Sequence, residues 1–241
     1  MYCCLGTTAW ISRILRQPYY DKHKRLFNII GLDGDSYGVT GTVQAAGRCI
    51  EWVKQLFEIE DFNTINIEAE KAPAGSENLI FLPYLEGERT PHFDSNARGV
   101  YFGISPVHKK EHFIRAALEG VSYALNNVMD VYKETGSVTS LPVIGGGTKS
   151  KIWKEIMASV MNIKLCTLEI SGEDITSLGV AAAALVGIGI YDTINDAVKG
   201  IKMGSEILPV KSMSQKYTSL YKVYNSLYPK LKGVFGNNNQ T

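Results

Sequence analysis

Apolar residues along the chain form short runs and helical stripes that alternate, with polar turns between them. Short apolar runs bounded by Gly, Pro or charged residues indicate strands. The predicted strand segments are 2–15 (YCCLGTTAWISRIL, strand–turn–strand), 78–85 (NLIFLPYL), 99–104 (GVYFGI), 141–144 (LPVI) and 163–170 (IKLCTLEI). In the first segment, Gly6, Thr7 and Thr8 form the turn. Residues 18–41 are polar and turn-rich, so we expect a loop with a short strand there.

Helical spacing of apolar residues marks the other elements. From Thr42 onward, apolar residues recur at 43, 46, 50, 53 and 57, which predicts an amphipathic helix. A long helix is predicted over roughly 110–135, with the stripe Phe113, Ala117, Val121, Ala124, Val128 and Val131 and a stop at Gly136. Further helices are predicted directly after the glycines 145–147, over 174–189, at 193–198 (TINDAV) and over 214–235.

Two of these helices differ in what their residues predict. The Ala-rich helix at 174–189 carries small residues, which indicates close packing against a neighbour. The last helix carries an aromatic stripe, which is more often core than a ligand box. Residues 58–78 are acidic and predicted to be irregular, and the terminal NNNQT is expected to be disordered. The alternation of strands and helices predicts an α/β layer fold in a single domain.

Composition limits the classes of function. With 45% hydrophobic and 20% charged residues the chain is an ordinary globular protein, and its net charge of +1 gives no support for a nucleic-acid or anionic-membrane partner. The longest apolar run, 178–190, is too short to span a bilayer. The first ten residues lack the pattern of a signal peptide, and we expect a cytoplasmic protein.

Cysteine and histidine usage points away from a disulfide framework and a metal site. Cys3, Cys4, Cys49 and Cys166 contain no CxxC pair, and we interpret them as reduced core thiols. His108 and His112 stand at i,i+4 in HKKEH, a spacing that could hold a metal but better fits a solvated helix start. We therefore predict no metal ligands in this chain.

Two glycine-bearing turns follow predicted strands. In Leu5-Gly6-Thr7-Thr8, backbone N–H groups and hydroxyls could converge on an anion, although an ordinary hairpin turn explains this segment equally well. Gly145, Gly146 and Gly147 lie where a strand meets a helix, and the missing Cβ atoms would let a nucleotide approach the backbone. The alternative is a tight βα turn, since neither GxxxxGK[ST] nor GxGxxG occurs here.

A charged loop, YLEGERTPHFDSNARG, occupies residues 84–99 between two apolar strands. Glu88 could pair with Arg89 and Asp94 with Arg98, giving a buried ion network that shapes the loop. Direct catalysis by these charges is the less favoured interpretation.

Together, several stretches resemble the FGGY family of carbohydrate kinases, in the family's order and over nearly the whole chain. They are LGTTAW (5–10), AAGRCIEW (45–52), FLPYLEGERTPHFDSNARGVYFGI (81–104), FIRAALEGVSYAL (113–125), IGGGTKSKIWKEIMAS (144–159) and SLGVAAAA (177–184). GERTP followed by ARG, with GGGTKS, is most similar to the xylulokinase branch. The resemblance implies a ribonuclease H-like (actin/hexokinase-type ATPase) domain with a mixed sheet flanked by helices.

The resemblance also implies which residues bind ATP and Mg²⁺. Gly6 and Thr7, with Thr8 beside them, match the family's second phosphate-binding turn. Gly47 and Glu51 match a helix face near the nucleotide. The adenosine-binding motif corresponds to Gly145, Gly146, Gly147 and Lys151, where glycerol kinases have an amide in place of Lys151. The GERTP loop is expected near the cleft, where Arg89 could also stabilise phosphate charge.

The match is to the C-terminal half of the family, so residues 1–235 are expected to form the nucleotide-binding domain and 236–241 a disordered tail. The N-terminal half, with the catalytic Asp and most sugar contacts, is expected to be absent, so this chain would contain no catalytic residue. The resulting hypothesis is the ATP-binding half of a kinase for D-xylulose, inactive alone and able to form a homodimer. Alternatives are half of a gluconate or other sugar kinase, a non-catalytic nucleotide-binding module, and a degenerate fragment.

Overall fold

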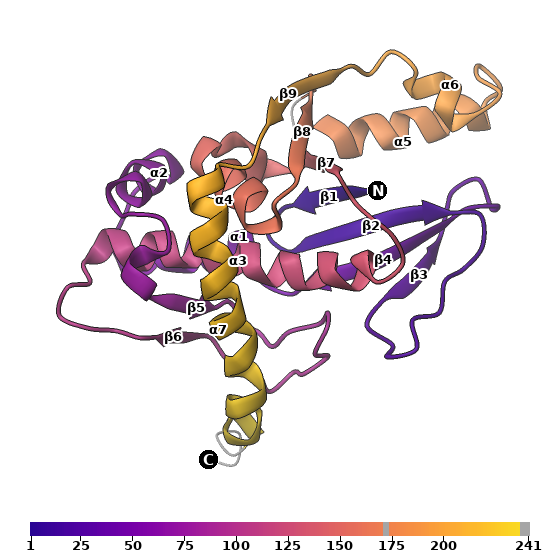
Figure 1. Ribbon diagram of the computed structural model, residues 1–241. Coiled ribbons are helices and arrows are strands. Elements are labelled where there is room, and N and C mark those ends of the chain that lie inside the picture. The colour runs from indigo at the N-terminus through magenta and orange to yellow at the C-terminus, as the bar shows by residue number, and fades with distance from the viewer. Residues whose placement is uncertain (171–173, 237–241) are drawn as a thin grey trace.

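The computed structural model describes residues 1–170 and 174–236, and within these ranges seven strands form one mixed sheet (Figure 1). The strand order is β3-β4-β2-β1-β7-β8-β9. The strands are β1 (Tyr2–Leu5), β2 (Ala9–Leu15), β3 (Phe27–Ile30), β4 (Tyr37–Val43), β7 (Ser140–Ile144), β8 (Lys164–Leu168) and β9 (Met203–Ile207). The pairs β1–β7 and β7–β8 are parallel, whereas the other neighbours are antiparallel. Strands β5 (Ile80–Leu82) and β6 (Val100–Phe102) form a separate two-stranded sheet.

The predicted first hairpin is confirmed. Leu5 pairs with Ala9 across the turn, which the bond from Gly6 N to the Thr8 carbonyl closes at 3.0 Å. Cys3 and Leu5 of β1 and Ile11 of β2 are buried, as the side-chain alternation of a strand requires. All four cysteines are free thiols, and burial raises the pKa of Cys3 and Cys49 well above the ordinary value.

Helix α3 (Lys110–Lys133) is the central helix of the core and is confirmed close to its predicted range. It packs against β2, β4, β5 and the helices α1 (Gly47–Leu56), α2 (Phe62–Lys71) and α4 (Lys151–Met161). Gly120 of α3 lies so close to β5 that a Cβ there would be 2.3 Å from the Phe81 carbonyl oxygen. This contact brings the β5–β6 sheet directly onto the helix.

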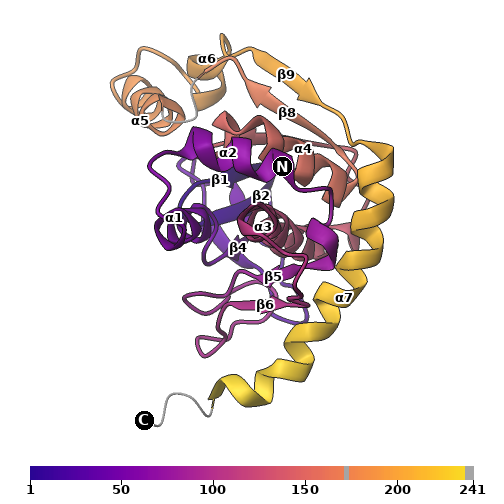
Figure 2. The same ribbon diagram turned by 90° about the vertical axis from the view of Figure 1, so that its left-hand side faces the viewer.

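The last helix, α7 (Lys211–Phe235), runs along one edge of the molecule (Figure 2). Its aromatic stripe belongs to the core, as predicted; the buried members are Tyr217, Leu220, Tyr224, Leu227 and Tyr228. Gly236 ends this helix, and the rest of the expected disordered tail, 237–241, lies outside the described residues. The described part of the chain contains no helix that is both long and apolar enough to cross a membrane.

Two predictions of secondary structure were wrong in detail. The helix expected from Thr42 begins at Gly47, because residues 42 and 43 complete β4 and pair with β2. The segment 58–78 is not irregular: Asp61 caps α2 by accepting a 2.8 Å bond from Thr64 N, and Ile65 and Ala69 are buried one turn apart. A short 3₁₀ helix, η1 (Ser76–Asn78), follows α2.

Other differences concern the two ends of the sheet. Residues 18–41 provide β3 and most of β4, where we expected one short strand. Strand β9 was not predicted. Helix α5 (Asp174–Gly187) is present, but Ala182 is its one buried residue among those described, so the described part of the chain does not provide the expected close packing along this helix. Figures 1 and 2 show α5 and α6 (Ile194–Val198) at the periphery, and Thr193 caps α6 as predicted.

A buried ion pair joins α2, α3 and α7. Arg115 Nε donates to Glu119 Oε1 at 2.9 Å, and the same oxygen accepts bonds from Gly75 N (2.8 Å) and the Tyr217 hydroxyl (2.9 Å). Arg115 also donates to the carbonyl of Ala72 at the end of α2. Since these partners satisfy most of both charged groups, the pair fixes how the three helices meet.

The charged loop is held differently from our expectation. Glu88 is buried, but its Oε1 accepts bonds from the backbone N–H groups of Gln44 (2.8 Å) and Arg89 (2.7 Å) rather than from a cationic side chain. Asp94 Oδ2 accepts a bond from the Tyr228 hydroxyl at 2.8 Å. The loop is therefore fixed by backbone amides and by α7. Burial raises the pKa of Glu88 to about 8, and the two N–H groups and the charge of Arg89 offset only part of that effect.

We predict that Glu119→Gln destabilises the chain by about 3–5 kcal/mol, because it leaves Arg115 buried without its counter-charge. Urea unfolding followed by circular dichroism measures the loss. The matched control is Glu155→Gln, which breaks the exposed i,i+4 pair with Lys151 and should cost at most about 0.5 kcal/mol. Equal losses for the two variants would contradict a special role for the buried pair.

Stability should fall as pH rises from about 5 to 8. The folded-state pKa of Glu88 lies above its unfolded value, so in this window the folded state holds a proton that the unfolded state has lost. Glu88→Gln should remove this part of the pH dependence, a difference on the order of 3 kcal/mol at pH 8 relative to pH 5. Denaturant unfolding of both proteins across the pH series is the measurement. Parallel stability curves for them would show that Glu88 titrates normally.

Candidate functional site

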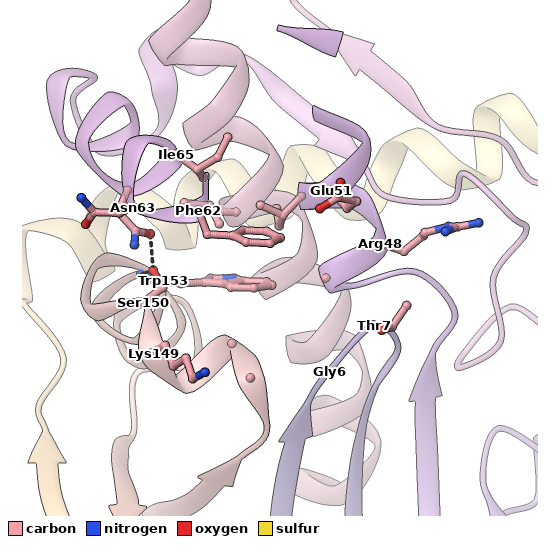
Figure 3. A pocket seen from close by; sticks show the side chains of 16 residues that line it. Gly6, Thr7, Arg48, Glu51, Phe62, Asn63, Ile65, Lys149, Ser150 and Trp153 are labelled. Atoms are coloured by element: carbon pink, nitrogen blue, oxygen red, sulfur yellow. Dashed lines mark hydrogen bonds between the residues drawn. The ribbon is translucent and has the colours of Figure 1, made fainter. Parts of the chain in front are cut away.

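A cavity of about 760 Å³ lies between the β1–β2 turn, α1, α2 and the start of α4 (Figure 3). Six of the residues predicted from the sequence line it together: Gly6, Thr7, Gly47, Glu51, Gly146 and Gly147. These residues come from three segments that are far apart in the sequence. The fold therefore brings the two predicted glycine turns to one site.

The β1–β2 turn is packed against the beginning of α1. Gly47 N donates to the Gly6 carbonyl at 2.9 Å, while Ala46 N and Arg48 N donate to the Thr7 carbonyl. A Cβ on Gly47 would be 2.7 Å from the Gly6 oxygen, so only glycine allows this approach. These first N–H groups of α1 already donate to the turn. An anion at this end of the cavity would therefore have to accept its hydrogen bonds from the turn instead.

The three glycines at 145–147 have two different roles. Gly145 has φ +96°, and a Cβ there would be 2.6 Å from the Leu5 carbonyl oxygen. A Cβ on Gly147 would be 2.5 Å from Leu5 Cγ. By contrast, a Cβ on Gly146 would have no atom within 4 Å, and Gly146 lines the cavity. Two glycines thus hold the backbone against β1, and the third leaves open space for a ligand.

The start of α4 is tied to α2 at the floor of the cavity. Ser150 caps α4 by accepting a bond from Trp153 N at 3.1 Å, and its hydroxyl donates to Asn66 Oδ1 of α2 at 2.7 Å. Figure 3 shows Ser150 and Trp153 on one side of the cavity, with Phe62 and Asn63 of α2 facing them. The indole Nε1–H of Trp153 is buried and has no acceptor in the described part of the chain.

Most of the residues that line this cavity were not predicted from the sequence. The missed residues are Arg48, Ile50, Phe62, Asn63, Ile65, Asn66, Leu118, Lys149, Ser150 and Trp153. Those on α2 lie in an acidic segment whose composition predicts irregular structure. The signal was present: an N-cap Asp61 is followed by Ile65 and Ala69 at helical spacing. Ser150 and Trp153 lie within the first turn of the helix that was predicted after the triple glycine.

Three predicted site residues do not line this cavity. Gly145 turns the backbone behind it, as described above. Thr8 lines a separate cavity of about 490 Å³, together with Trp10, Thr42 and Arg89. The Lys151 side chain is 86% exposed, with its Nζ 3.8 Å from Glu155 Oε1.

The charges that do line the site are paired in part. Glu51 lies 3.3 Å from Lys54 Nζ and accepts a bond from Gln55, which offsets its negative charge. Arg48 Nε lies 3.1 Å from Glu86 Oε1. The cavity therefore has bare backbone and a hydroxyl at the turn, and an apolar, aromatic wall at Phe62 and Trp153. Such a division suits a ligand with one anionic and one flat end.

Comparisons with known proteins agree with this architecture. The model of the FGGY family of carbohydrate kinases, C-terminal domain, matches residues 1–188. A xylulose kinase from Staphylococcus epidermidis is 35% identical over 235 residues, covering 95% of this chain and 47% of that protein. A gluconokinase from Bacillus subtilis is 30% identical over 236 residues, covering 92% and 45%. The chain spans about half the length of these curated relatives.

A solved structure of ligand-bound xylulose kinase from Lactobacillus acidophilus superposes with a TM-score of 0.87 at 28% identity, covering 98% of this chain and 48% of that one. This confirms the predicted fold class, a mixed sheet with flanking helices of the actin/hexokinase type. The family match, covering the turn Leu5–Thr8, Gly47 and the triple glycine, confirms the resemblance found in the sequence. The chain belongs to the FGGY family of carbohydrate kinases and corresponds to its C-terminal half.

Proposed function

We propose that residues 1–235 form the ATP-binding domain of a sugar kinase, which transfers the γ-phosphate of ATP to D-xylulose when it works with a sugar-binding half. The observation that carries this proposal is the single cavity formed by the two glycine turns and the α2–α4 wall. Its volume of about 760 Å³ is in the range of small-molecule sites.

The residues present fit an adenine nucleotide. At one end, the Gly6–Thr7 turn offers backbone and a hydroxyl for phosphate groups. At the other, Gly146 leaves space that any side chain would fill, and the buried Nε1–H of Trp153 has no acceptor among residues 1–170 and 174–236. Phe62 and Trp153 supply apolar surface for a flat base. Lys151, which points to solvent, is not assigned a direct contact.

D-xylulose is proposed as the first substrate because the more similar curated relatives carry that activity in their names, at 35% identity against 30% for a gluconokinase. GERTP and GGGTKS support the same branch. A gluconate kinase remains the alternative, since relatives of both names match over most of this chain, 95% and 92% of it.

In the proposed mechanism this chain positions the nucleotide and excludes water, which are the main needs of phosphoryl transfer. The Thr7 turn would hold the phosphates, while the α2–α4 wall would orient the base. Within residues 1–170 and 174–236, no group of three His, Cys, Asp or Glu side chains is arranged to hold a metal ion. Mg²⁺ would therefore be held mainly by the nucleotide's phosphates and by the other half, which would also supply the general-base Asp.

Two apolar surfaces support a second half that covers this one. Three isoleucines are each more than half exposed: Ile14 of β2 and Ile29 and Ile30 of β3. All three line the same cavity of about 490 Å³ as Thr8. Helix α5, rich in Ala, Val and Leu, is mostly exposed as well. Surfaces of this kind commonly belong to interfaces.

Isothermal titration calorimetry of this chain with ADP tests nucleotide binding directly. We expect saturable binding, reduced at least tenfold by Gly146→Leu, because the new side chain would enter the cavity without touching the backbone of β1. Gly179→Ala, on exposed α5, is the matched control and should bind as the parent does. Absence of binding by the folded parent would refute the proposed function.

Phosphoryl transfer should require the second half. The chain alone is expected to consume no ATP with D-xylulose, whereas adding the N-terminal half of an FGGY xylulose kinase should restore transfer. A coupled ADP-release assay, run in parallel with gluconate, measures this and ranks the two sugars. If nucleotide binds but the folded halves together transfer no phosphate to either sugar, the chain would be a non-catalytic nucleotide-binding module.

A further inference from the structure

One charged side chain of the nucleotide cavity has no role in the function proposed above, although it lies at the phosphate end. Among the described residues, three charged ones line this cavity: Arg48, Glu51 and Lys149. Glu51 is paired with Lys54, and Lys149 follows the triple glycine, at the end proposed for the base. Arg48 is the second residue of α1, and its backbone N–H donates to the Thr7 carbonyl at 3.1 Å. Its side chain therefore starts within one hydrogen bond of the turn that would hold phosphate.

The guanidinium of Arg48 is held by a single exposed contact. Its Nε donates to Glu86 Oε1 at 3.1 Å, and its two terminal amino groups have no partner in the described part of the chain. The Arg48 side chain is 58% exposed and that of Glu86 is 46% exposed. Exposed ion pairs of this kind change an equilibrium by at most about fivefold, because water screens both charges. The pair can therefore be broken at little cost.

A nucleotide phosphate is a stronger partner for this guanidinium than Glu86 is. The planar fork of N–H donors matches phosphate oxygens in a two-point contact, and the outer phosphates carry more negative charge than one carboxylate. Figure 3 shows Arg48 beside Thr7, at the end of the cavity away from the apolar wall. A nucleotide whose base lies on that wall, against Phe62 and Trp153, would therefore extend its outer phosphates toward Arg48.

Glu86 does not become an isolated charge when Arg48 leaves it. It also lines the loop cavity, a smaller space of about 310 Å³ beside the charged loop, which Arg89 lines too. Because almost half of the Glu86 side chain is exposed, its carboxylate stays in contact with water. Losing Arg48 thus costs Glu86 little, and the gain at the phosphates decides the exchange.

We propose that Arg48 is a phosphate-binding residue of the nucleotide site, which exchanges its pair with Glu86 for the outer phosphates of a nucleoside di- or triphosphate. This proposal rests on the proposed nucleotide function and deepens it, because it makes the affinity depend on how many phosphates the ligand carries. It also links the nucleotide to the charged loop, since phosphate binding releases Glu86 from α1.

Isothermal titration calorimetry with ATP, ADP and adenosine measures this dependence, with the weaker affinities taken from displacement of ADP. Arg48→Gln should weaken the binding of ATP and ADP at least tenfold and leave that of adenosine within about twofold of the parent. Glu86→Gln removes the competing carboxylate and should strengthen ATP binding about two- to fivefold. The matched control is Arg16→Gln, which removes the same charge from another exposed pair, with Asp33, and should change none of the three affinities.

The outcomes separate this proposal from the proposed function. If the parent binds ADP and the Arg48→Gln variant keeps the parent's ratio of ATP to adenosine affinity, Arg48 is not a phosphate ligand, while the nucleotide site stands. Weaker ATP binding by Glu86→Gln would show that Glu86 orients Arg48 rather than competes for it, which overturns the exchange. Binding of none of the three ligands by the parent would refute the nucleotide site itself. Circular dichroism checks that each protein is folded.

Discussion

The contact of one tight turn with two glycine-bearing segments organises this domain. Leu5 and Gly6 are approached by Gly145 and Gly147 from one side and by Gly47 from the other, at distances that leave no room for Cβ atoms. The parallel pairing of β1 with β7 and the start of α1 both depend on this approach. A side chain at Gly47 or Gly145 would separate the segments and open the cavity that they share.

The same contact explains why the glycines of a single motif are not equivalent. Gly145 and Gly147 serve the packing of backbone against Leu5, so their effect on a ligand is indirect. Gly146 alone faces open space. Different elements form the two ends of the cavity. The turn provides the polar end. The junction of α2 with α4, which the Ser150–Asn66 hydrogen bond fixes, provides the flat apolar wall. The Arg115–Glu119 pair fixes the end of α2 against α3 and α7.

Much of this arrangement could be predicted from the sequence, because its signals are local. The first hairpin, α3 and the core face of α7 follow from apolar spacing, and the glycine turns from missing Cβ atoms. The predictions that failed concern features that tertiary packing decides. The cap at Asp61 was hidden in an acidic segment, so α2 and its cavity residues were missed. The charges of Glu88 and Asp94 suggested ion pairs, yet backbone amides bond one oxygen of Glu88 and the Tyr228 hydroxyl bonds Asp94, a choice that only packing decides. The nucleotide role of the predicted residues remains a prediction.

The exposed apolar residues are best understood together with the buried polar ones. Isolated small domains usually bury their apolar faces and pair their polar atoms. Here Ile29, Ile30 and Val180 are exposed, while Glu88 Oε2 and Gln44 Oε1 are buried and have no hydrogen-bond partner among the described residues. The exposed apolar side chains are of the kind that an interface covers, whereas the unpaired oxygens lie beneath the surface and add to the cost of folding. Since the sheet-face cavity and the loop cavity share Arg89, a surface that covers one of them would also restrict the side chain that lines the other.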